Sequence, residues 1–255
     1  MNRGLVSVVS PICDSAFIGE AIESVLAQSY AAWEMIIVDD CSSDGGAGIA
    51  VVNSYAGRDS RIRLIASGEK RGSSGARNIA LRAARGRYVA FLDSDDLWHP
   101  DFLERQLSFM ERNGAFLVFS SYRRIDETAR EEVLPPFAVP PKADYRSLLK
   151  TCPIFLSTAI YDTSKIEKIY FNEALGSLRD DYVYWLSMLR EGGCAYGNPE
   201  VLADYRLRKN SVTADKRRVV GPQWNVLRKV ERLSLIRSAY CLCCWAVTGY
   251  FKYRR

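Results

Sequence analysis

Three carboxylates follow directly after an apolar run near residue 90. The segment reads Tyr88-Val-Ala-Phe-Leu-Asp93-Ser94-Asp95-Asp96. Its Val, Phe and Tyr residues predict a buried strand over 88–92, so the acidic residues lie at the exposed carboxyl end, where α/β sheets bind ligands. A divalent cation, Mg²⁺ or Mn²⁺, would relieve the repulsion between them. The alternative is a solvated acidic loop in which Asp96 caps a helix that begins near Pro100.

A second acidic pair follows an earlier apolar run. The segment reads Ile36-Ile-Val-Asp39-Asp40-Cys-Ser42-Ser43-Asp44. Parallel strands share one orientation, so Asp39 is expected at the same edge as Asp93. An Asp at that edge can accept a hydrogen bond from a nucleobase N–H or a ribose hydroxyl. The alternative is that Asp39 and Asp40 only organise a turn with the serines that follow.

A basic turn rich in Gly and Ser lies between the two acidic edges. It reads Lys70-Arg71-Gly72-Ser73-Ser74-Gly75-Ala76-Arg77-Asn78. Small residues let the backbone approach a ligand, and the start of a helix favours anions. Arg71 or Arg77 can fork onto phosphate oxygens, which indicates a phosphate site. The alternative is an ordinary helix cap.

The elements that must position these residues alternate along the first 120 residues. We predict strands at 5–10, 33–39, 61–66, 88–92 and 116–120, and helices near 16–29, 46–57, 73–85 and 99–113. Such alternation predicts an α/β fold, with a mainly parallel sheet and helices on both faces.

The pattern changes after residue 120. Residues 123–150 carry two Pro-Pro pairs and many charges, which predicts a long excursion across the surface. We then expect a strand over 151–161, a helix over about 179–191, a strand over 201–207, a linker around 209–216 and helical sequence from about 220 onward.

Composition narrows the chemistry. The 255 residues are 48% hydrophobic, which supports a large core. No charged segment followed by an apolar leader opens the sequence, and the seven cysteines lack zinc spacing, so we expect a reduced, cytoplasmic protein. His99 is the one histidine. Acid–base chemistry must therefore depend on carboxylates.

The last fifty residues are strongly basic. Residues 206–255 hold 13 Lys and Arg against 2 Asp and Glu. The apolar run over 239–251 is too short to span a bilayer, so we expect a basic amphipathic tail over 216–255 that lies on the inner membrane surface. The alternative is a tail that packs on the domain or forms a homodimer contact. No nucleic-acid motif accompanies the charge.

Several motifs together resemble a known family. They read Val6-Ser-Val-Val-Ser-Pro11, Ala21-Ile-Glu-Ser-Val-Leu-Ala-Gln28-Ser-Tyr30, Ile36-Ile-Val-Asp39-Asp40, Gly75-Ala-Arg77-Asn78 and Phe91-Leu-Asp93-Ser-Asp95-Asp96-x-Trp98-x-Pro100. In this order they resemble the inverting nucleotide-sugar glycosyltransferases of family 2, above all the bacterial enzymes that assemble capsule, teichuronic acid, exopolysaccharide or O-antigen. The resemblance implies a GT-A fold over residues 1–215. Residues 1–120 would bind the nucleotide-sugar, and residues 121–215 the acceptor.

The resemblance also implies roles for single residues. Asp39 would contact uracil, flanked by Pro11 and Asp40. Asp95, with Asp93, would hold the metal that binds the diphosphate, with Ser94 between them. The family's catalytic carboxylate precedes a helix and a Trp, which matches Arg179-Asp180-Asp181-Tyr-Val-Tyr-Trp185. We expect Asp181 to be the base and Asp180 a substitute or helper. The alternative is that both are merely N-terminal residues of a helix.

One departure from the family pattern concerns phosphate binding. Family members often carry Tyr-Arg-x-His, whereas this chain reads Tyr205-Arg206-Leu-Arg208. Arg208 therefore becomes a candidate for binding phosphate. We expect transfer of a sugar from a UDP-sugar to a lipid-linked saccharide acceptor. The alternatives are a nucleotidyltransferase of similar fold and a non-catalytic binding module.

Overall fold

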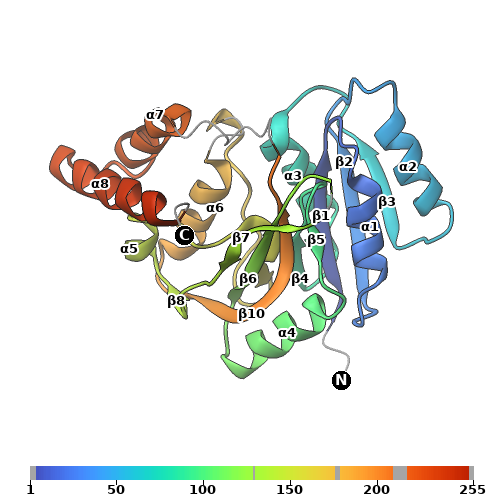
Figure 1. Cartoon of the computed structure of the whole chain (residues 1–255), viewed down its shortest axis with the longest axis horizontal. Coiled ribbons are helices and arrows are strands. Elements are labelled where there is room, and N and C mark those ends of the chain that lie inside the picture. The colour runs from blue at the N-terminus through green and yellow to red at the C-terminus, as the bar shows by residue number, and fades with distance from the viewer. Residues whose placement is uncertain (1–3, 129, 176–178, 209–216, 253–255) are drawn as a thin grey trace.

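The computed structural model describes residues 4–128, 130–175, 179–208 and 217–252, and centres on one mixed sheet (Figure 1). The strand order is β3-β2-β1-β4-β9-β6-β10-β5, with β7 paired to β6 and β8 paired to β10. The strands are β1 (Val6–Ile12), β2 (Trp33–Asp39), β3 (Ile62–Ala66), β4 (Tyr88–Phe91), β5 (Leu97–Trp98), β6 (Leu117–Ile125), β7 (Glu132–Phe137), β8 (Lys142–Ala143), β9 (Ile160–Asp162) and β10 (Ala195–Arg206).

Helices cover both faces of this sheet. Helices α1 and α4 pack on one face around Ile22 and Leu107, and α3 and α6 pack on the other around Leu81 and Trp185. The helices are α1 (Ile18–Leu26), α2 (Ala47–Ala56), α3 (Gly72–Ala83), α4 (Phe102–Arg112), α5 (Tyr145–Leu148), α6 (Asp180–Leu189), α7 (Arg217–Asn225), a π-helical turn (Val226–Val230) and α8 (Leu235–Lys252). The predicted α/β class with helices on both faces is confirmed.

The strand pairing explains why the sheet is mixed. Strands β3, β2, β1 and β4 run parallel, as do β6 and β10. Strand β9 lies between β4 and β6 and is antiparallel to both. All seven residues of β2 are buried, as expected for a strand covered on both faces. At Gly86 a Cβ would lie 2.6 Å from the carbonyl oxygen of Leu5, so only glycine lets the chain enter β4 this close to β1.

The second half departs from the sequence predictions at three places. The strand expected over 151–161 is limited to Ile160–Asp162, because the residues before it form a loop and a 3₁₀ turn, Leu156–Thr158, that bury apolar side chains without strand pairing. The predicted excursion over 123–150 contains two strands and α5, which begins with a capping box at Asp144. Strand β10 also begins six residues before the expected 201, at Ala195.

The helical tail is interrupted rather than continuous. Arg232, with φ of 51°, separates the π-helical turn from α8. Leu227, Leu233 and Cys241 are buried in the same core as α6, so the tail packs on the domain along one side. The predicted linker over 209–216 lies outside the described residues. In the part of the chain that the structure describes, no helix is long and apolar enough to cross a bilayer.

Candidate active site

The carboxyl ends of β1, β2 and β4 meet at one edge of the sheet. Pro11 lies near the end of β1 and pairs with Val38 of β2, one residue before Asp39. Asp93 follows two residues after the end of β4. The parallel register brings the two predicted acidic segments to the same edge, because each strand delivers its last residues there.

The two carboxylates of the first acidic pair bind different segments: Asp39 binds the turn that follows it, and Asp40 binds the start of α3. Asp39 accepts a hydrogen bond from the hydroxyl of Ser42 at 2.5 Å. Asp40 accepts the backbone N–H groups of Arg71 at 2.6 Å and Gly72 at 2.8 Å. Asp40 therefore fixes the basic turn at the start of α3 beside Asp39.

Arg77 connects the strand-end carboxylate to the carboxylate pair on α6. Its guanidinium donates to Asp93 at 2.7 Å and to Asp180 at 3.0 Å, and its side chain is 7% exposed. The hydroxyls of Ser73 and Ser74 also donate to Asp180, at 3.1 and 2.9 Å. Segments more than 80 residues apart thus meet at one buried cation, and its two terminal nitrogens are already paired with carboxylates.

Asp95 lies beside a second, more accessible arginine. Arg208 contacts its carboxylate at 3.3 Å and the carboxylate of Glu127 at 3.9 Å. Burial and the neighbouring charge of Asp93 raise the pKa of Asp95 above its ordinary value, and Arg208 opposes that rise. Asp95 is therefore a carboxylate that gains from a nearby cation.

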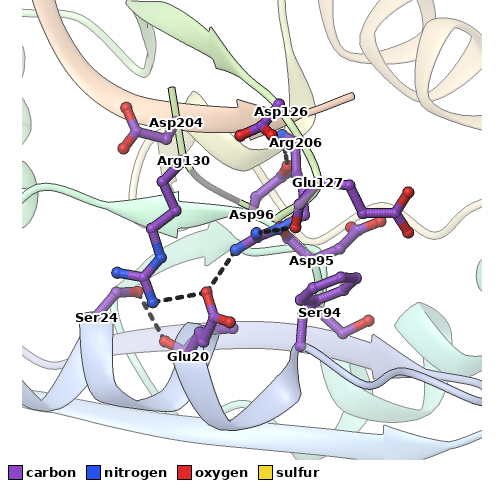
Figure 2. Close-up of polar contacts among 12 residues, drawn as sticks. Glu20, Ser24, Ser94, Asp95, Asp96, Asp126, Glu127, Arg130, Asp204 and Arg206 are labelled. Carbon is purple, nitrogen blue, oxygen red and sulfur yellow. Dashed lines mark hydrogen bonds and ion pairs between the residues drawn. The ribbon is translucent and has the colours of Figure 1, made fainter. Parts of the chain in front are cut away.

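The backbone at Asp95 is held by Arg206, whose side chain is 1% exposed. Figure 2 shows its guanidinium among three segments. It donates to the carbonyl oxygens of Asp95 and Glu127, each at 2.9 Å, and to the carboxylate of Glu20 at 2.6 Å. The guanidinium also lies 4.2 Å from the ring of Phe17. Arg206 therefore ties the acidic loop to α1 and to the segment after β6.

Asp96 is buried and holds neighbouring segments together, and the prediction that it caps a helix is wrong. The residue that precedes α4 is Asp101. Asp96 accepts a hydrogen bond from the hydroxyl of Ser157 at 2.5 Å and from the backbone of Arg206 at 3.2 Å. Burial, together with the charges of Asp95 and Asp93, raises its pKa well above the usual range.

Asp181 has far fewer partners than Asp180. Within the described residues, its one hydrogen bond comes from the backbone N–H of Tyr182, at 2.7 Å. Burial raises the pKa of its carboxyl, and the charge of Asp180 adds to that effect, while Arg179 opposes it. A half-buried carboxylate with a raised pKa and no side-chain partner is chemically suited to accept a proton.

A groove of about 550 Å³ lies along α1 and β5 and is lined in part by residues 97–100, which follow the acidic loop. Its lining includes Glu20, His99 and Asp204. Glu20 pairs with Arg206 and Arg130, and His99 contacts Asp204 at 3.0 Å (Figure 2 draws Glu20, Arg130 and Asp204). These polar groups are satisfied by one another, and α6 lies on the opposite face of the sheet. The groove is therefore separate from the carboxylates of α6.

The sequence interpretation missed the groups that hold the carboxylates in place. It assigned no role to Ser73, Ser74, Ser157 or Arg206, although each hydrogen-bonds to one of the predicted acidic residues. Two of these serines stand in the Gly/Ser-rich turn, and Arg206 stands in the quoted Tyr-Arg motif. Those two motifs are the signals that could have identified them.

The fold and this arrangement of carboxylates and arginines define a glycosyltransferase of the GT-A type. The family model for Glycosyl transferase family 2 matches residues 7–205, which is most of the chain. The chain therefore belongs to glycosyltransferase family 2. Family membership decides against the two alternatives raised from the sequence, which were a nucleotidyltransferase and a non-catalytic binding module.

Relatives similar over nearly their whole length carry glycosyltransferase names. TuaG of Bacillus subtilis, whose name assigns it to teichuronic acid biosynthesis, is 38% identical, over 96% of this chain and 95% of its own. The Escherichia coli enzyme WfgD is 34% identical, over 95% of this chain and 92% of its own. Its name is UDP-Glc:alpha-D-GlcNAc-diphosphoundecaprenol beta-1,3-glucosyltransferase.

Solved structures agree on the fold. TarS residues 1–349 of S. aureus, in complex with UDP-GlcNAc, superpose with a TM-score of 0.68 at 20% identity, over 93% of this chain and 70% of that one. The mannosyltransferase PcManGT of Pyrobaculum calidifontis, in complex with GDP-Man and Mn²⁺, gives a TM-score of 0.66 at 21% identity, over 95% and 69%. At these identities the likeness bears on the fold alone.

Proposed function

We propose that this glycosyltransferase transfers a sugar, with inversion, from a UDP-sugar to a lipid-linked saccharide during assembly of a bacterial surface polysaccharide. The names of TuaG and WfgD support the pathway and the acceptor class. The observation that carries the mechanism is the chain of contacts from Asp93 through Arg77 to Asp180, the residue next to Asp181. Residues 1–120 hold the donor in this proposal, and residues 121–215 hold the acceptor.

Asp181 acts as the general base. It removes the proton of the acceptor hydroxyl while that oxygen attacks the anomeric carbon of the donor sugar. The bond from the anomeric carbon to the diphosphate oxygen breaks, and UDP leaves with the electron pair. Asp180 keeps its contacts with Arg77 and the two serines, so it positions the start of α6 instead of moving the proton.

The donor lies across the edge formed by β1, β2 and β4. Asp39 and Pro11 flank the uracil. Arg71 and Arg208, which are 39% and 36% exposed, face the diphosphate. Sequence interpretation gave Arg77 the same duty, but its buried pairing with two carboxylates assigns it to positioning.

The residues present fit a divalent cation shared with the substrate. In the described ranges no group of three or more His, Cys, Asp or Glu side chains could hold a metal ion. Mg²⁺ and Mn²⁺ need no such cage, because one or two carboxylates plus substrate phosphates suffice. Asp95, with Asp93, would hold it, and the burial and the neighbouring Asp93 charge that raise the pKa of Asp95 support a cation there. When bound, the ion would stabilise the charge that develops on the leaving diphosphate.

A panel of radiolabelled UDP-sugars with a lipid-diphosphate saccharide tests this function. We expect transfer from one donor, and a fall of at least about 100-fold in kcat for Asp181→Asn with UDP affinity unchanged. Asp101→Asn, at the start of α4, is the matched control and should keep full activity. Retained turnover in Asp181→Asn would exclude it as the base.

We also propose that α8 docks on an anionic membrane surface. Four of its apolar side chains are strongly exposed, between 55% and 85%: Leu235, Ile236, Tyr240 and Val247. Ile236, Tyr240 and Val247 share one helix face, because they are spaced by four and seven residues. Lys229, Arg232 and Arg237 are exposed in the same C-terminal segment, and each would add about 1 kcal/mol of attraction to anionic lipid. The enzyme would thus be peripheral at the inner face of the membrane.

Vesicle flotation distinguishes this surface from a dimer contact. Ile236→Asp with Val247→Asp should abolish flotation with phosphatidylglycerol vesicles, whereas Val133→Asp, on the exposed strand β7, should not. Binding that survives the double substitution would refute the proposal. Dimers in sedimentation that the same substitutions dissociate, without vesicle binding by the native chain, would make α8 a dimer contact instead.

A further inference from the structure

Helix α6 and the C-terminal helices α7 and α8 meet at Arg179, the residue just before Asp180. Its Nε donates to the side-chain oxygen of Gln223 on α7 at 2.8 Å. Its guanidinium carbon lies 5.1 Å from the ring centre of Tyr182 on α6 and 5.0 Å from that of Trp245 on α8. Arg179 adopts a φ of 71°, a left-handed backbone that non-glycine residues rarely hold. Three helices therefore converge on one cation beside the proposed base.

The polar atoms at this junction are not all satisfied. Nη2 of Arg179, Nε2 of Gln223 and the hydroxyl of Tyr182 are buried without a hydrogen-bond partner in the described structure. Gln223 and Tyr182 are each 1% exposed, and the hydroxyl of Tyr182 lies near Gln223. Buried donors rarely remain unpaired, and even where the Tyr182 hydroxyl and the Gln223 amide pair with each other, Nη2 of Arg179 is left without an acceptor, which indicates a ligand that supplies acceptor oxygens.

The chemistry of these groups selects an anion. Nη2 and Nε2 can only donate, and Arg179 brings a positive charge. Three carboxylates act on these groups: Asp180 is paired with Arg77, Glu231 is paired with Arg190, and Asp181 has a pKa that burial raises and Arg179 opposes. A guanidinium with an adjacent amide donor is a common arrangement for phosphate oxygens.

We propose that Arg179, Gln223 and Tyr182 bind the phosphate attached to the acceptor sugar. This inference rests on the proposed function, and it sharpens the acceptor class to one sugar linked through diphosphate to a lipid. In such an acceptor the attacking hydroxyl and the phosphate belong to the same sugar ring. The base and the phosphate site must therefore be close neighbours, as Asp181 and Arg179 are.

The position of α8 supports the same assignment. Trp245 contacts Arg179 from the helix whose outer side exposes Ile236 and Val247. A helix that lies on the membrane would then place the site near the lipid headgroups, which is the level of a lipid-linked diphosphate. In this proposal the contact between Trp245 and Arg179 also makes α8 a part of the acceptor site.

The test compares two acceptors that carry the same sugar, one on a lipid diphosphate and one on an uncharged alkyl chain. The native enzyme should prefer the diphosphate by at least tenfold in kcat/KM, mainly through KM. Arg179→Gln should lose that preference, because KM for the diphosphate acceptor should rise at least tenfold more than KM for the uncharged acceptor, while the affinity for UDP is kept. Arg179→Lys should recover part of the preference, because the charge remains. Arg105→Gln, on the exposed side of α4, is the matched control and should change neither acceptor's kinetics.

Each outcome distinguishes the two proposals. Equal losses on both acceptors in Arg179→Gln, or a native enzyme with no preference for the diphosphate, would overturn the phosphate site and leave the transferase proposal standing. A native enzyme that is inert toward both acceptors would count against the proposed function itself. Gln223→Leu provides an independent variant should Arg179→Gln unfold, and it should raise KM for the diphosphate acceptor alone.

Discussion

Replacing Arg77 by methionine should destabilise the protein by about 3 kcal/mol. Breaking a buried ion pair by removing one partner costs about 3–5 kcal/mol, because the other charge stays buried. Two carboxylates lose a partner here, but Asp93 is 30% exposed and water can replace the guanidinium there. Asp180 is 6% exposed and keeps only two serine hydroxyls. The cost therefore falls mainly on Asp180, which places it at the lower end of the range.

Thermal unfolding measures this cost directly. For a chain of this size about 3 kcal/mol lowers the unfolding midpoint by roughly 6–12 °C. Adding Asp180→Asn to Arg77→Met should recover about 2 kcal/mol, because the uncompensated charge is then gone. Arg105→Met is the control, since its ion pair with Asp101 is exposed and is worth less than about 1 kcal/mol.

The same variant separates positioning from substrate binding. Once Arg77 is absent, Asp180 is released and the start of α6 is no longer fixed, so kcat should fall much more than the affinity for UDP. A stability within about 1 kcal/mol of the native protein, or no recovery with Asp180→Asn, would refute the reading of Arg77 as a buried tie. An equal fall in UDP affinity and kcat would instead support the diphosphate role predicted from the sequence.

Three further predictions follow from other parts of the structure. Because burial and Asp180 raise the pKa of Asp181 and a base acts deprotonated, kcat/KM should fall with decreasing pH through a midpoint above the ordinary Asp value. Asp180→Asn should move that midpoint to lower pH in a pH–rate profile. Burial raises the pKa of Asp204, but Arg123 and His99 lower it by more than burial raises it, so the pKa is about 2. The ionised Asp204 should therefore add about 2 kcal/mol to the free energy of unfolding above pH 4. This stabilisation should be lost as the pH falls from about 4 to 2. Urea unfolding at several pH values should show a smaller loss of stability for Arg123→Met than for the native protein. At Gly197 a Cβ would lie 2.0 Å from the carbonyl oxygen of Pro140, so Gly197→Ala should lower the melting temperature by several degrees, whereas Gly221→Ala, in open space, should not.

The strands of the first half could be predicted because their signal is local. Strand β2 occupies the expected residues, 33–39, and β1, β3 and β4 lie within two residues of their predicted bounds. Continuous apolar runs between turn residues specify such buried parallel strands. Their common orientation then brought Asp39 and Asp93 to one edge, as expected.

The second half could not be predicted in the same way, because its pairing is set by distant residues. Strand β9 has three residues and is stabilised by β4 and β6 on either side, and no periodic pattern marks it within the apolar segment 151–161. The role of Arg77 had the same difficulty. Its partner Asp180 lies 103 residues away, so a local reading of the Gly/Ser-rich turn indicated phosphate.

The two neighbouring carboxylates at the start of α6 show how the fold gives identical side chains different surroundings. Asp180 faces α3, where Ser73, Ser74 and Arg77 hold one of its oxygens. Asp181 receives one backbone N–H and has the charge of Asp180 beside it. An environment that fixes the first carboxylate and raises the pKa of the second is a common way to assign a holder and a base. Exchanging the roles would require α3 to turn its serines toward Asp181. A variant with Ser73→Ala and Ser74→Ala should therefore reduce kcat by loosening Asp180, without making Asp180 the base.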